Sequence, residues 1–480
     1  MRELPTLLSL GHFVDGRWRS AVGDRASTCP FNTRHTIGWF PAEADAVDDA
    51  VTLSHRFGQK WQRLALSDRI QVLLRFARAL ANAREELATL ICAEVGKPWN
   101  EALAEADLLA SKIRLTCDIA PRELGPTIPD RVDGFWDYRP HGVVVVLGPF
   151  NFPMHLSNGH IAPALVAGNA VILKPSEVAP ACGQAYVRIW EESAGEWAGA
   201  LSLLQGGGAT GAALAEHEGV HAVCFTGSWS VGVRIRQATV AQTGKLLALE
   251  MGGKNPALVF DDADLDHAAD QVTAAALQST GQRCTATSRV LVQRAVADEF
   301  TAKLLERVRA WSPGDPFADD GRRLGPLATA AAAERFYAAQ QQTDGLETLL
   351  AATAVSTLTP GHWVLPAVHK VLDVASSVPR WSEELFGPEL LIEVVDSDEE
   401  AVARANATAY GLAASIHTTT HSRFQRARDD VRAGIINWNR GTAGASSAMP
   451  FGGVGHSGNH RPAGVFSLRY CVYPVATLLR

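Results

Sequence analysis

An α/β fold with a doubly wound parallel sheet is the class that this sequence predicts. From residue 141 onward, apolar runs of strand length recur without alternation, as in strands buried on both faces of a parallel sheet; they occupy residues 143–147, 170–173, 201–204, 222–225 and 246–249. Helix-length intervals such as residues 182–192 and 230–239 separate them, which indicates repeated βαβ units. Because 480 residues are too many for one hydrophobic core, we expect two or three domains.

The first quarter of the chain is predicted to be largely helical after an extended start at residues 13–39. A helical region begins near residue 42. Ser67 is the expected N-cap of one helix, because apolar residues recur at helical spacing behind it, at Ile70, Leu73, Leu74, Ala77 and Leu80. Gly96 and Pro98 end the next helix, a further helix covers residues 100–117, and residues 121–139 are typical of a linker or hairpin.

A second α/β region follows residue 250. Residues 257–260 are expected to form a strand and residues 264–279 a helix, and the pattern continues to about residue 432. The C-terminal residues 470–479 alternate enough to form another strand. Because this strand is apolar for a terminus, we expect it to pair with another chain.

Composition and charge argue against several classes of function. A hydrophobic fraction of 47% and a charged fraction of 20% are ordinary for a globular protein, and a net charge of −7 gives no broad cationic surface for nucleic acid. The seven cysteines are scattered and form no CxxC, which argues against a disulfide framework or a zinc site and for a reducing compartment. We therefore expect a cytoplasmic protein with no metal and no membrane or nucleic-acid partner.

Cys284 is the candidate nucleophile. It lies between the predicted helix and an apolar run that begins at Val290, and Gly281 just ahead of it permits a sharp turn. A thiol at such a junction can face a cleft. The alternative is a small buried hydrophobic residue, as most free cysteines are.

Two turns that follow predicted strands are suited to a nucleotide. Gly227 and Ser228 follow one strand, and a serine-capped helix there would favour a phosphate. Lys174 and Glu177 follow another strand, where they can bond ribose hydroxyls. Either turn can also be an ordinary polar loop.

Two further residues could take part in catalysis. Asn151 offers an amide donor for an oxyanion, or it bonds its own backbone. Glu250 ends an apolar strand and is either a base or the partner of Lys254 in an ion pair. With Cys284 they form a set that can oxidise an aldehyde: the thiolate attacks, donors hold the oxyanion, hydride leaves to nicotinamide, and a glutamate activates water.

These residues lie in motifs through which the chain resembles the aldehyde dehydrogenase superfamily, from about residue 12 to its end. The motifs are GPFNFP (148–153), KPSE (174–177), FTGS (225–228), EMGGK (250–254), GQRC (281–284), ELFGP (384–388) and PFGG (450–453). The resemblance implies a Rossmann-type NAD-binding domain at residues 1–118 and 140–252 and a catalytic α/β domain at residues 253–440. It also implies a small oligomerisation sheet from residues 119–139 and 461–480, in a homodimer or homotetramer.

The resemblance further implies the roles of individual residues. Cys284 would be the nucleophile, Glu250 the general base and Asn151 the oxyanion donor. The cofactor NAD would be held by residues of the matched motifs: Lys174, Ser176, Glu177, Gly227, Ser228, Trp229, Ser230, Val231, Gly232, Glu384 and Phe386. NAD is expected rather than NADP, because Glu177 would accept hydrogen bonds from a 2′-hydroxyl and repel a 2′-phosphate.

Within the superfamily the chain is most similar to the N-succinylglutamate 5-semialdehyde dehydrogenases of bacterial arginine degradation. The likeness lies in residues 148–161, 437–440 with 444–447, and 457–462. An anionic aldehyde would then be held by cations, for which Arg440, His460 and Arg461 are the candidates. Residues 285–288 and 441–442 depart from that subfamily, since the second cysteine, the paired arginines and a Pro-Leu pair are missing.

Three alternatives stay open at this point. The first is another or broader semialdehyde oxidation within the same reaction class. The second is transfer of the acyl group to coenzyme A, against which Glu250 argues because a base there serves to activate water. The third is a catalytically silent structural protein, against which the three filled catalytic positions argue.

Overall fold

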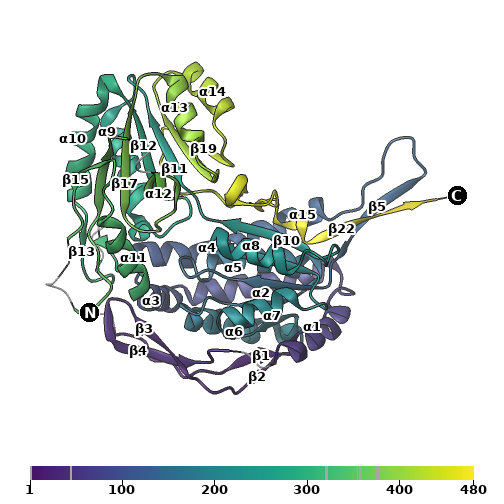
Figure 1. The fold of residues 1–480 in the computed structure, drawn as a ribbon. Helices are drawn as coiled ribbons and strands as arrows, with labels where there is room; N and C mark the ends of the chain where they lie inside the picture. Colours follow the sequence, from purple (N-terminus) through teal and green to yellow (C-terminus); the bar gives the residue numbers. More distant parts are fainter. Residues whose placement is uncertain are drawn as a thin grey trace.

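The computed structural model describes residues 3–43, 46–318, 323–353, 355, 359–373 and 378–479. Two seven-stranded sheets form two α/β halves, one above the other in Figure 1, and a two-stranded arm projects from the body. The predicted fold class is therefore confirmed.

The first sheet has the strand order β10-β9-β6-β7-β8-β1-β2. The five strands from β10 to β8 in this order are parallel, and their bounds are β6 Val143–Leu147, β7 Ala170–Lys174, β8 Leu201–Leu203, β9 Ala222–Gly227 and β10 Leu246–Met251. Two short antiparallel strands, β1 (His12–Val14) and β2 (Arg17–Arg19), extend the sheet beyond β8. The strand order reverses between β6 and β9, so the sheet is doubly wound.

Helices cover both faces of this sheet. Alternate residues of β6 enter different hydrophobic cores, as strands buried on both faces require. One core packs against α2 (Leu66–Asn82), α3 (Arg84–Val95), α4 (Trp99–Glu123), α5 (His155–Ala167) and α6 (Pro180–Ala194). The other packs against α1 (Val47–Trp61), α7 (Gly208–Glu216) and α8 (Trp229–Ala238).

The second sheet has the order β15-β16-β17-β12-β11-β18-β19 and is parallel except for β15. Its strands are β11 Asn255–Val259, β12 Thr287–Gln293, β15 Leu346–Leu350, β16 Ala367–Val371, β17 Glu389–Val395, β18 Ala413–His417 and β19 Ile435–Trp438. The helices of this half are α9 Leu265–Leu277, α10 Ala297–Arg309, α11 Ala330–Gln340, α12 Val378–Ser382, α13 Asp398–Asn406 and α14 His421–Asp430. The helices α9 and α10 cover one face, and α13 and α14 cover the other.

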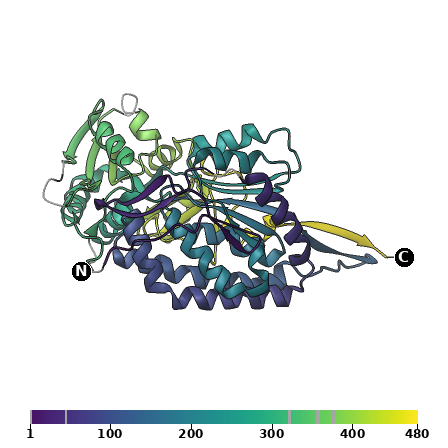
Figure 2. The same cartoon turned by 90° about the horizontal axis from the view of Figure 1, so that it is seen from below.

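Shorter elements complete the chain. The arm consists of β5 (Gly134–Pro140) paired antiparallel with β22 (Val472–Leu478), and the turned view shows the C-terminus at its tip (Figure 2). The remaining pairs and short helices are β3 Arg25–Cys29 with β4 Asn32–Phe40, β13 Ser312–Pro313 with β14 Arg323–Leu324, β20 Pro450–Phe451 with β21 Ala463–Gly464, the 3-10 turns Gly195–Ala200, Gln278–Gly281, Arg294–Val296 and Gly455–Ser457, and α15 Ser467–Tyr470.

Three predicted boundaries were wrong. The first helix begins at Val47, not near residue 42. The N-cap of α2 is Ala65, and Ser67 lies inside the helix, because the apolar pattern defines the buried face but not the first residue. Residues 121–123 belong to α4 instead of a linker: Pro121 lacks only its own N–H, and Leu124 still donates to the carbonyl of Ala120 at 2.9 Å.

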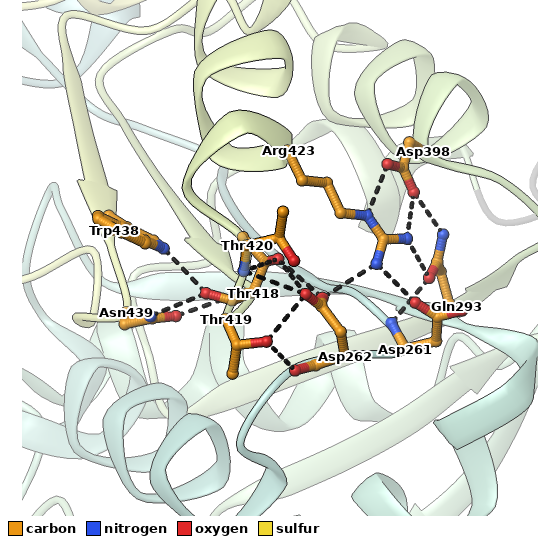
Figure 3. A network of polar contacts seen from close by, with 10 residues as sticks. All are labelled: Asp261, Asp262, Gln293, Asp398, Thr418, Thr419, Thr420, Arg423, Trp438 and Asn439. Atoms are coloured by element: carbon orange, nitrogen blue, oxygen red, sulfur yellow. Dashed lines mark hydrogen bonds and ion pairs between the residues drawn. The ribbon is translucent and has the colours of Figure 1, made fainter.

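The carboxyl edge of the second sheet is filled by a polar network (Figure 3). The guanidinium of Arg423 bonds Asp261, Asp262 and Asp398 at 2.5 to 2.9 Å. The hydroxyl of Thr418 donates to Asp262 at 2.7 Å. Protein side chains therefore occupy this edge, and the opposite, amino edge is the one that faces the first sheet.

No helix within the described ranges is long and apolar enough to cross a membrane. In the same part of the chain, no cluster of three or more His, Cys, Asp or Glu side chains is placed to hold a metal ion.

Candidate active site

The polar loops that the sequence singled out lie along one edge of the first sheet. Because β6, β7, β9 and β10 are parallel, their carboxyl ends meet there. Asn151 follows β6, Glu177 follows β7, Ser228 follows β9, and Glu250 lies near the end of β10. The strand order reverses at this edge, which is where α/β sheets bind their ligands.

Cys284 reaches this edge through the link between the two sheets. Strand β10 ends at Met251 and β11 begins at Asn255, so the chain passes from the carboxyl edge of one sheet to the amino edge of the other. Strand β12, which follows Cys284, pairs in parallel with β11. Cys284 and Glu250 are therefore brought to the same region.

The turn that precedes Cys284 is held by a glutamate from another helix. Ser279 and Thr280 adopt φ values of 51° and 55°, a conformation that costs a non-glycine residue about 1–2 kcal/mol. Glu101 of α4 accepts from the N–H of Ser279 at 3.1 Å and from its Oγ at 2.6 Å. The same carboxylate pairs with Arg283 at 2.6 Å. Contacts with Glu101 thus fix the position of residues 279–284, which we call the nucleophile loop after the candidate role of Cys284.

The surroundings of Cys284 strongly disfavour the anionic form of its thiol. Burial, followed by the charges of Glu384 and Glu250, raises its pKa to about 12. The backbone N–H groups of Cys284 and Thr285 lower the pKa, but by less. Cys284 is half-buried, whereas the other six cysteines are buried.

Glu250 carries a carboxylate oxygen with nothing to bond. Its side chain is 5% exposed, and its Oε2 is buried with no hydrogen-bond partner among the described residues. Burial raises the pKa of Glu250 well above its ordinary value, and a backbone N–H of Ala463 lowers it only in part. The alternative of an ion pair with Lys254 is not found in the described part of the chain. A buried, unpartnered carboxylate is costly unless it serves a ligand or water.

Asn151 is buried beside the nucleophile loop. Its Nδ2 donates to the carbonyl of Gln282 at 2.9 Å. An amide nitrogen carries two hydrogens, so this bond orients the group and leaves one N–H for a ligand. The alternative in which Asn151 bonds only its own loop is therefore wrong.

Glu384 and Phe386 lie against the two segments that carry Glu250 and Cys284. Oε1 of Glu384 accepts from the N–H of Gly253 at 3.0 Å. A Cβ on Gly281 would overlap the carbonyl of Gly387, so the nucleophile turn packs directly on this loop. The ring of Phe386 meets that of Phe150 edge-on at 5.9 Å.

The turn after β7 presents one half-exposed carboxylate. Lys174 is buried and donates to the carbonyls of Pro175 and Gly206 at 2.7 and 2.8 Å. Ser176 accepts from the N–H of Val178 at 3.2 Å, as a turn residue does. The side chain of Glu177 is 47% exposed and lies 3.7 Å from the Lys174 ammonium, so it can accept hydroxyl donors.

The start of α8 is open to a phosphate. Ser228 is its N-cap and accepts from the N–H of Val231 at 3.4 Å. Ser228, Trp229 and Ser230 are exposed, and the N–H groups of the last two have no acceptor among the described residues. A Cβ on Gly232 would overlap the sulfur of Met251, so the helix packs closely on β10. The residues present fit a dinucleotide.

Trp229 has a contact that the sequence did not predict. Its indole stacks on the ring of His456 with centroids 4.0 Å apart, so its side chain is engaged by the turn Gly455–Ser457. One face of the indole is therefore covered, although Trp229 remains 37% exposed. No motif connected these two distant residues.

The proposed substrate cations are exposed and are not gathered by printed contacts into one group. Arg440 follows β19, and its carbonyl accepts from Ser415 Oγ at 2.6 Å. His460 has φ 63°, and Arg461 donates to its carbonyl at 3.1 Å. An isolated bridge pairs Glu250 with Gly458, which brings this second segment next to the base.

The two segments that depart from the relatives meet in the structure. Thr442 donates to the carbonyl of Thr285 at 2.6 Å, and its hydroxyl lies 2.7 Å from that of Thr287. Sequence reasoning gave no role to Thr442, to Glu101 or to Asn255. Of these three residues, only Asn255 could have been found from the sequence, because a polar residue at the start of an apolar strand is unusual.

Comparison with known proteins identifies the family. The aldehyde dehydrogenase family matches residues 18–474. The N-succinylglutamate 5-semialdehyde dehydrogenase of Burkholderia thailandensis is 40% identical over 471 residues, which cover 97% of this chain and 96% of that protein. The chain therefore belongs to the aldehyde dehydrogenase family and is an aldehyde-oxidising oxidoreductase.

Solved structures agree with this assignment. A 1-pyrroline-5-carboxylate dehydrogenase from Thermus with bound NAD superposes with a TM-score of 0.93 at 28% identity, covering 99% of this chain and 93% of that one. A gamma-glutamyl-gamma-aminobutyraldehyde dehydrogenase from Burkholderia cenocepacia has a TM-score of 0.93 at 32% identity, covering 100% and 97%. The family and the NAD-bound neighbour support a nicotinamide cofactor.

Proposed function

We propose that this protein oxidises N-succinylglutamate 5-semialdehyde to N-succinylglutamate with NAD, as a step of arginine catabolism. The observation that carries the proposal is the likeness to relatives of that name, 40% identical over 97% of this chain. The placement of Cys284, Asn151 and Glu250 in one region supports the reaction type.

The catalytic residues would act in two half-reactions. In the first, the Cys284 thiolate bonds the aldehyde carbon, and the oxyanion of the thiohemiacetal takes the free N–H of Asn151 and the backbone N–H of Cys284. The cofactor supplies the hydride acceptor, and the carbon becomes a thioester. In the second, Glu250 takes a proton from water, which attacks the thioester, releases the acid and restores the thiolate.

The preference for NAD would rest on Glu177. Its half-exposed carboxylate, 3.7 Å from the buried ammonium of Lys174, is placed to accept from a ribose 2′-hydroxyl. A 2′-phosphate there would meet a like charge. Ser176, Gly227, Ser230, Val231 and Gly232 would line the dinucleotide, and Glu384 and Phe386 would position the nicotinamide ribose and ring.

An anionic substrate would meet cations on the far side of Cys284. Arg440, His460 and Arg461 are the proposed contacts, because a guanidinium binds a carboxylate through two hydrogen bonds. The proximity of the 458–463 segment to Glu250 supports His460 and Arg461. A broader semialdehyde range is the second candidate, since the Thr285 and Thr442 contacts replace residues typical of the relatives.

The division of the chain is proposed as it was expected, with an NAD-binding domain at residues 1–118 and 140–252, a catalytic domain at 253–440, and an oligomerisation sheet from 119–139 and 461–480, except that residues 119–123 belong to helix α4 of the first domain. The chain link at residues 252–254 supports the first boundary. The projecting pair of β5 and β22 supports a homodimer or homotetramer. Seven free cysteines support a cytoplasmic location.

An NADH-coupled assay tests the proposal. Purified protein is given N-succinylglutamate semialdehyde, glutamate semialdehyde, succinate semialdehyde and neutral aldehydes of similar length, with Cys284→Ala as the blank. We expect the highest kcat/KM for the succinylated substrate and a preference for NAD over NADP. Equal kcat/KM values across the anionic aldehydes would favour the broad range, and product formation that requires coenzyme A would overturn the proposed second half-reaction.

A further inference from the structure

Two backbone N–H groups lower the pKa of the Cys284 thiol, and their direction depends on the carbonyls on the opposite side of the same peptides. The N–H groups belong to Cys284 and Thr285. In a trans peptide the N–H and the C=O point in opposite directions. The groups that donate hydrogen bonds to the carbonyls of Arg283 and Cys284 therefore orient these two N–H groups.

Asn255 holds the second of these peptides. It is 1% exposed at the start of β11, and its Nδ2 donates to the carbonyl of Cys284 and to that of Ala286, both at 2.8 Å. Its Oδ1 accepts from the N–H of Ala413 at 3.0 Å. A Cβ on Gly253 would overlap both the Cys284 carbonyl and the Asn255 amide, so only glycine permits this approach. All polar atoms of Asn255 are used on backbone groups.

Thr442 supports the first peptide, between Arg283 and Cys284, indirectly through the peptide between Thr285 and Ala286. The carbonyl of Arg283 accepts from the N–H of Ala286 at 3.0 Å. The carbonyl of the peptide that carries this N–H, at Thr285, accepts from the hydroxyl of Thr442 at 2.6 Å. Since a hydroxyl has one hydrogen, Thr442 must accept from Thr287, 2.7 Å away. Thr442 is fully buried.

We propose that Asn255 is a positioning residue for the nucleophile: by holding the carbonyl of Cys284 it orients the N–H of Thr285 in the same peptide, its bond to the carbonyl of Ala286 anchors the loop behind, and Thr442 supports the peptide that carries the N–H of Cys284. This inference rests on the proposed role of Cys284 as nucleophile. Asn255 touches no reacting atom. Its effect is to make the thiolate less unfavourable at a site where burial and two glutamates oppose it.

A second asparagine with the same bonding pattern provides a matched control. Asn169 is buried, its Nδ2 donates to the carbonyls of Ala164 and Cys471 at 3.0 and 2.9 Å, and its Oδ1 accepts from the N–H of Gly142 at 3.0 Å. It lies between α5 and β7 and makes no contact with the nucleophile loop in the described contacts. Asn255→Leu and Asn169→Leu each remove three side-chain hydrogen bonds to backbone groups. The first variant removes them at the loop of Cys284 and the second removes them elsewhere.

The test measures alkylation of Cys284 by iodoacetamide across pH, without substrate or cofactor, with Cys284→Ala as the blank for the buried cysteines. We expect Asn255→Leu to slow alkylation about tenfold at pH 8, which corresponds to a rise of about one pKa unit in the thiol. Asn169→Leu should stay within about twofold of the wild type at a similar loss of Tm, because it removes equivalent bonds elsewhere. Thr442→Val should slow alkylation about threefold.

Wild-type alkylation rates in both Asn255→Leu and Thr442→Val would overturn the proposal, as would equal slowing by Asn169→Leu. If Asn255→Leu does not fold, the isosteric Thr442→Val decides alone: slowing supports the proposal and the wild-type rate overturns it. Because alkylation needs no aldehyde, the proposed function can fail in the NADH assay while this result stands, and the two failures remain distinguishable.

Discussion

The backbone N–H of Gly253 donates a hydrogen bond of 3.0 Å to Oε1 of Glu384. This bond joins the segment behind Glu250 to the loop expected to hold the nicotinamide ribose. Burial raises the pKa of Glu384 to about 7, although the Gly253 bond and the charge of Lys254 lower it. The carboxyl therefore changes charge within the neutral range.

The pKa of Glu384 predicts how cofactor binding depends on pH. The ionised carboxylate accepts ribose hydroxyls better than the acid does, so KM for NAD should fall up to about tenfold between pH 6 and pH 8 as Glu384 loses its proton. Glu384→Gln should have a higher KM that is flat over this range. Steady-state kinetics at fixed aldehyde concentration measure both, and a retained slope in the Gln variant would assign the titration to another group.

Removal of the Glu250 carboxylate should separate the two half-reactions. Glu250→Gln keeps the shape of the side chain but cannot take a proton from water, so steady-state turnover should fall about 10²–10⁴-fold. The first turnover should still release NADH, seen as a burst in stopped-flow absorbance. Cys284→Ala should show no burst at all, and loss of the burst in Glu250→Gln would mean that Glu250 is needed for thiol attack instead.

The burial of Glu250 also sets a direction with pH. Because its pKa is raised well above the ordinary value, the acid form dominates at low pH and the base is lost. The steady-state kcat should therefore still rise with pH at values above the ordinary carboxyl range. The burst amplitude of the Gln variant supplies the control, because it should lack this dependence on Glu250.

Arg440→Ala should discriminate between charged and neutral aldehydes. If the exposed guanidinium binds a substrate carboxylate, its loss should raise KM about tenfold for the succinylated substrate, as for the loss of a charge-assisted hydrogen bond. A neutral aldehyde of similar length should be affected little. Arg461→Ala is the parallel variant on the other segment, and equal effects on both aldehydes would remove Arg440 from the pocket.

The arm should govern assembly. Tyr473 and Leu478 of β22 are 47% and 78% exposed, so a charge at either position should leave the folded subunit intact. In an oligomer built on the arm, Tyr473→Asp with Leu478→Asp should lower the molar mass seen by light scattering, because burying a charge in an apolar interface is unfavourable. Leu8→Asp is the control, because Leu8 is 89% exposed and lies near the opposite end of the sequence. An unchanged mass would place the interface elsewhere.

The Arg423 network should contribute to stability and not to catalysis. Burial raises the pKa of Asp262, but hydrogen bonds from Thr418, Thr420 and Thr419 and the charge of Arg423 outweigh it and bring the pKa to about 2. A carboxyl group whose pKa is lower in the folded state stabilises the fold at pH values above its unfolded pKa of 3.8. This contribution is lost as the pH falls toward 2.

Arg423→Ala should lower the free energy of unfolding by about 2–3 kcal/mol at pH 7, because three carboxylates lose a partly buried partner. The loss should be smaller near pH 3, where the carboxylates are partly protonated. Arg294→Ala, which breaks the exposed pair with Asp396, should cost less than about 1 kcal/mol. Denaturant unfolding at both pH values checks this, and equal losses in the two variants would contradict it.

Much of the fold could be predicted because the physical cause is local. Strands β6 to β10 consist mainly of apolar residues, because a strand that is buried on both faces needs apolar side chains on both, whichever segments pack against it. The N-cap of α8 at Ser228 was predicted for a similar reason, since a hydroxyl that follows a strand and precedes a helix satisfies a nearby N–H. The start of α2 was not, because its N-cap alanine makes no side-chain bond and leaves no signal.

The sequence by itself determined the residue types of the site: a thiol at 284, a carboxylate at 250 and an amide at 151, each in a motif next to a buried strand. Only the tertiary structure decided what surrounds them. The bridge from Glu250 to Gly458, the bond from Asn151 to Gln282 and the bonds from Asn255 to the loop of Cys284 join segments far apart in the chain. Such contacts depend on how two sheets meet edge to edge, and no local pattern encodes that geometry.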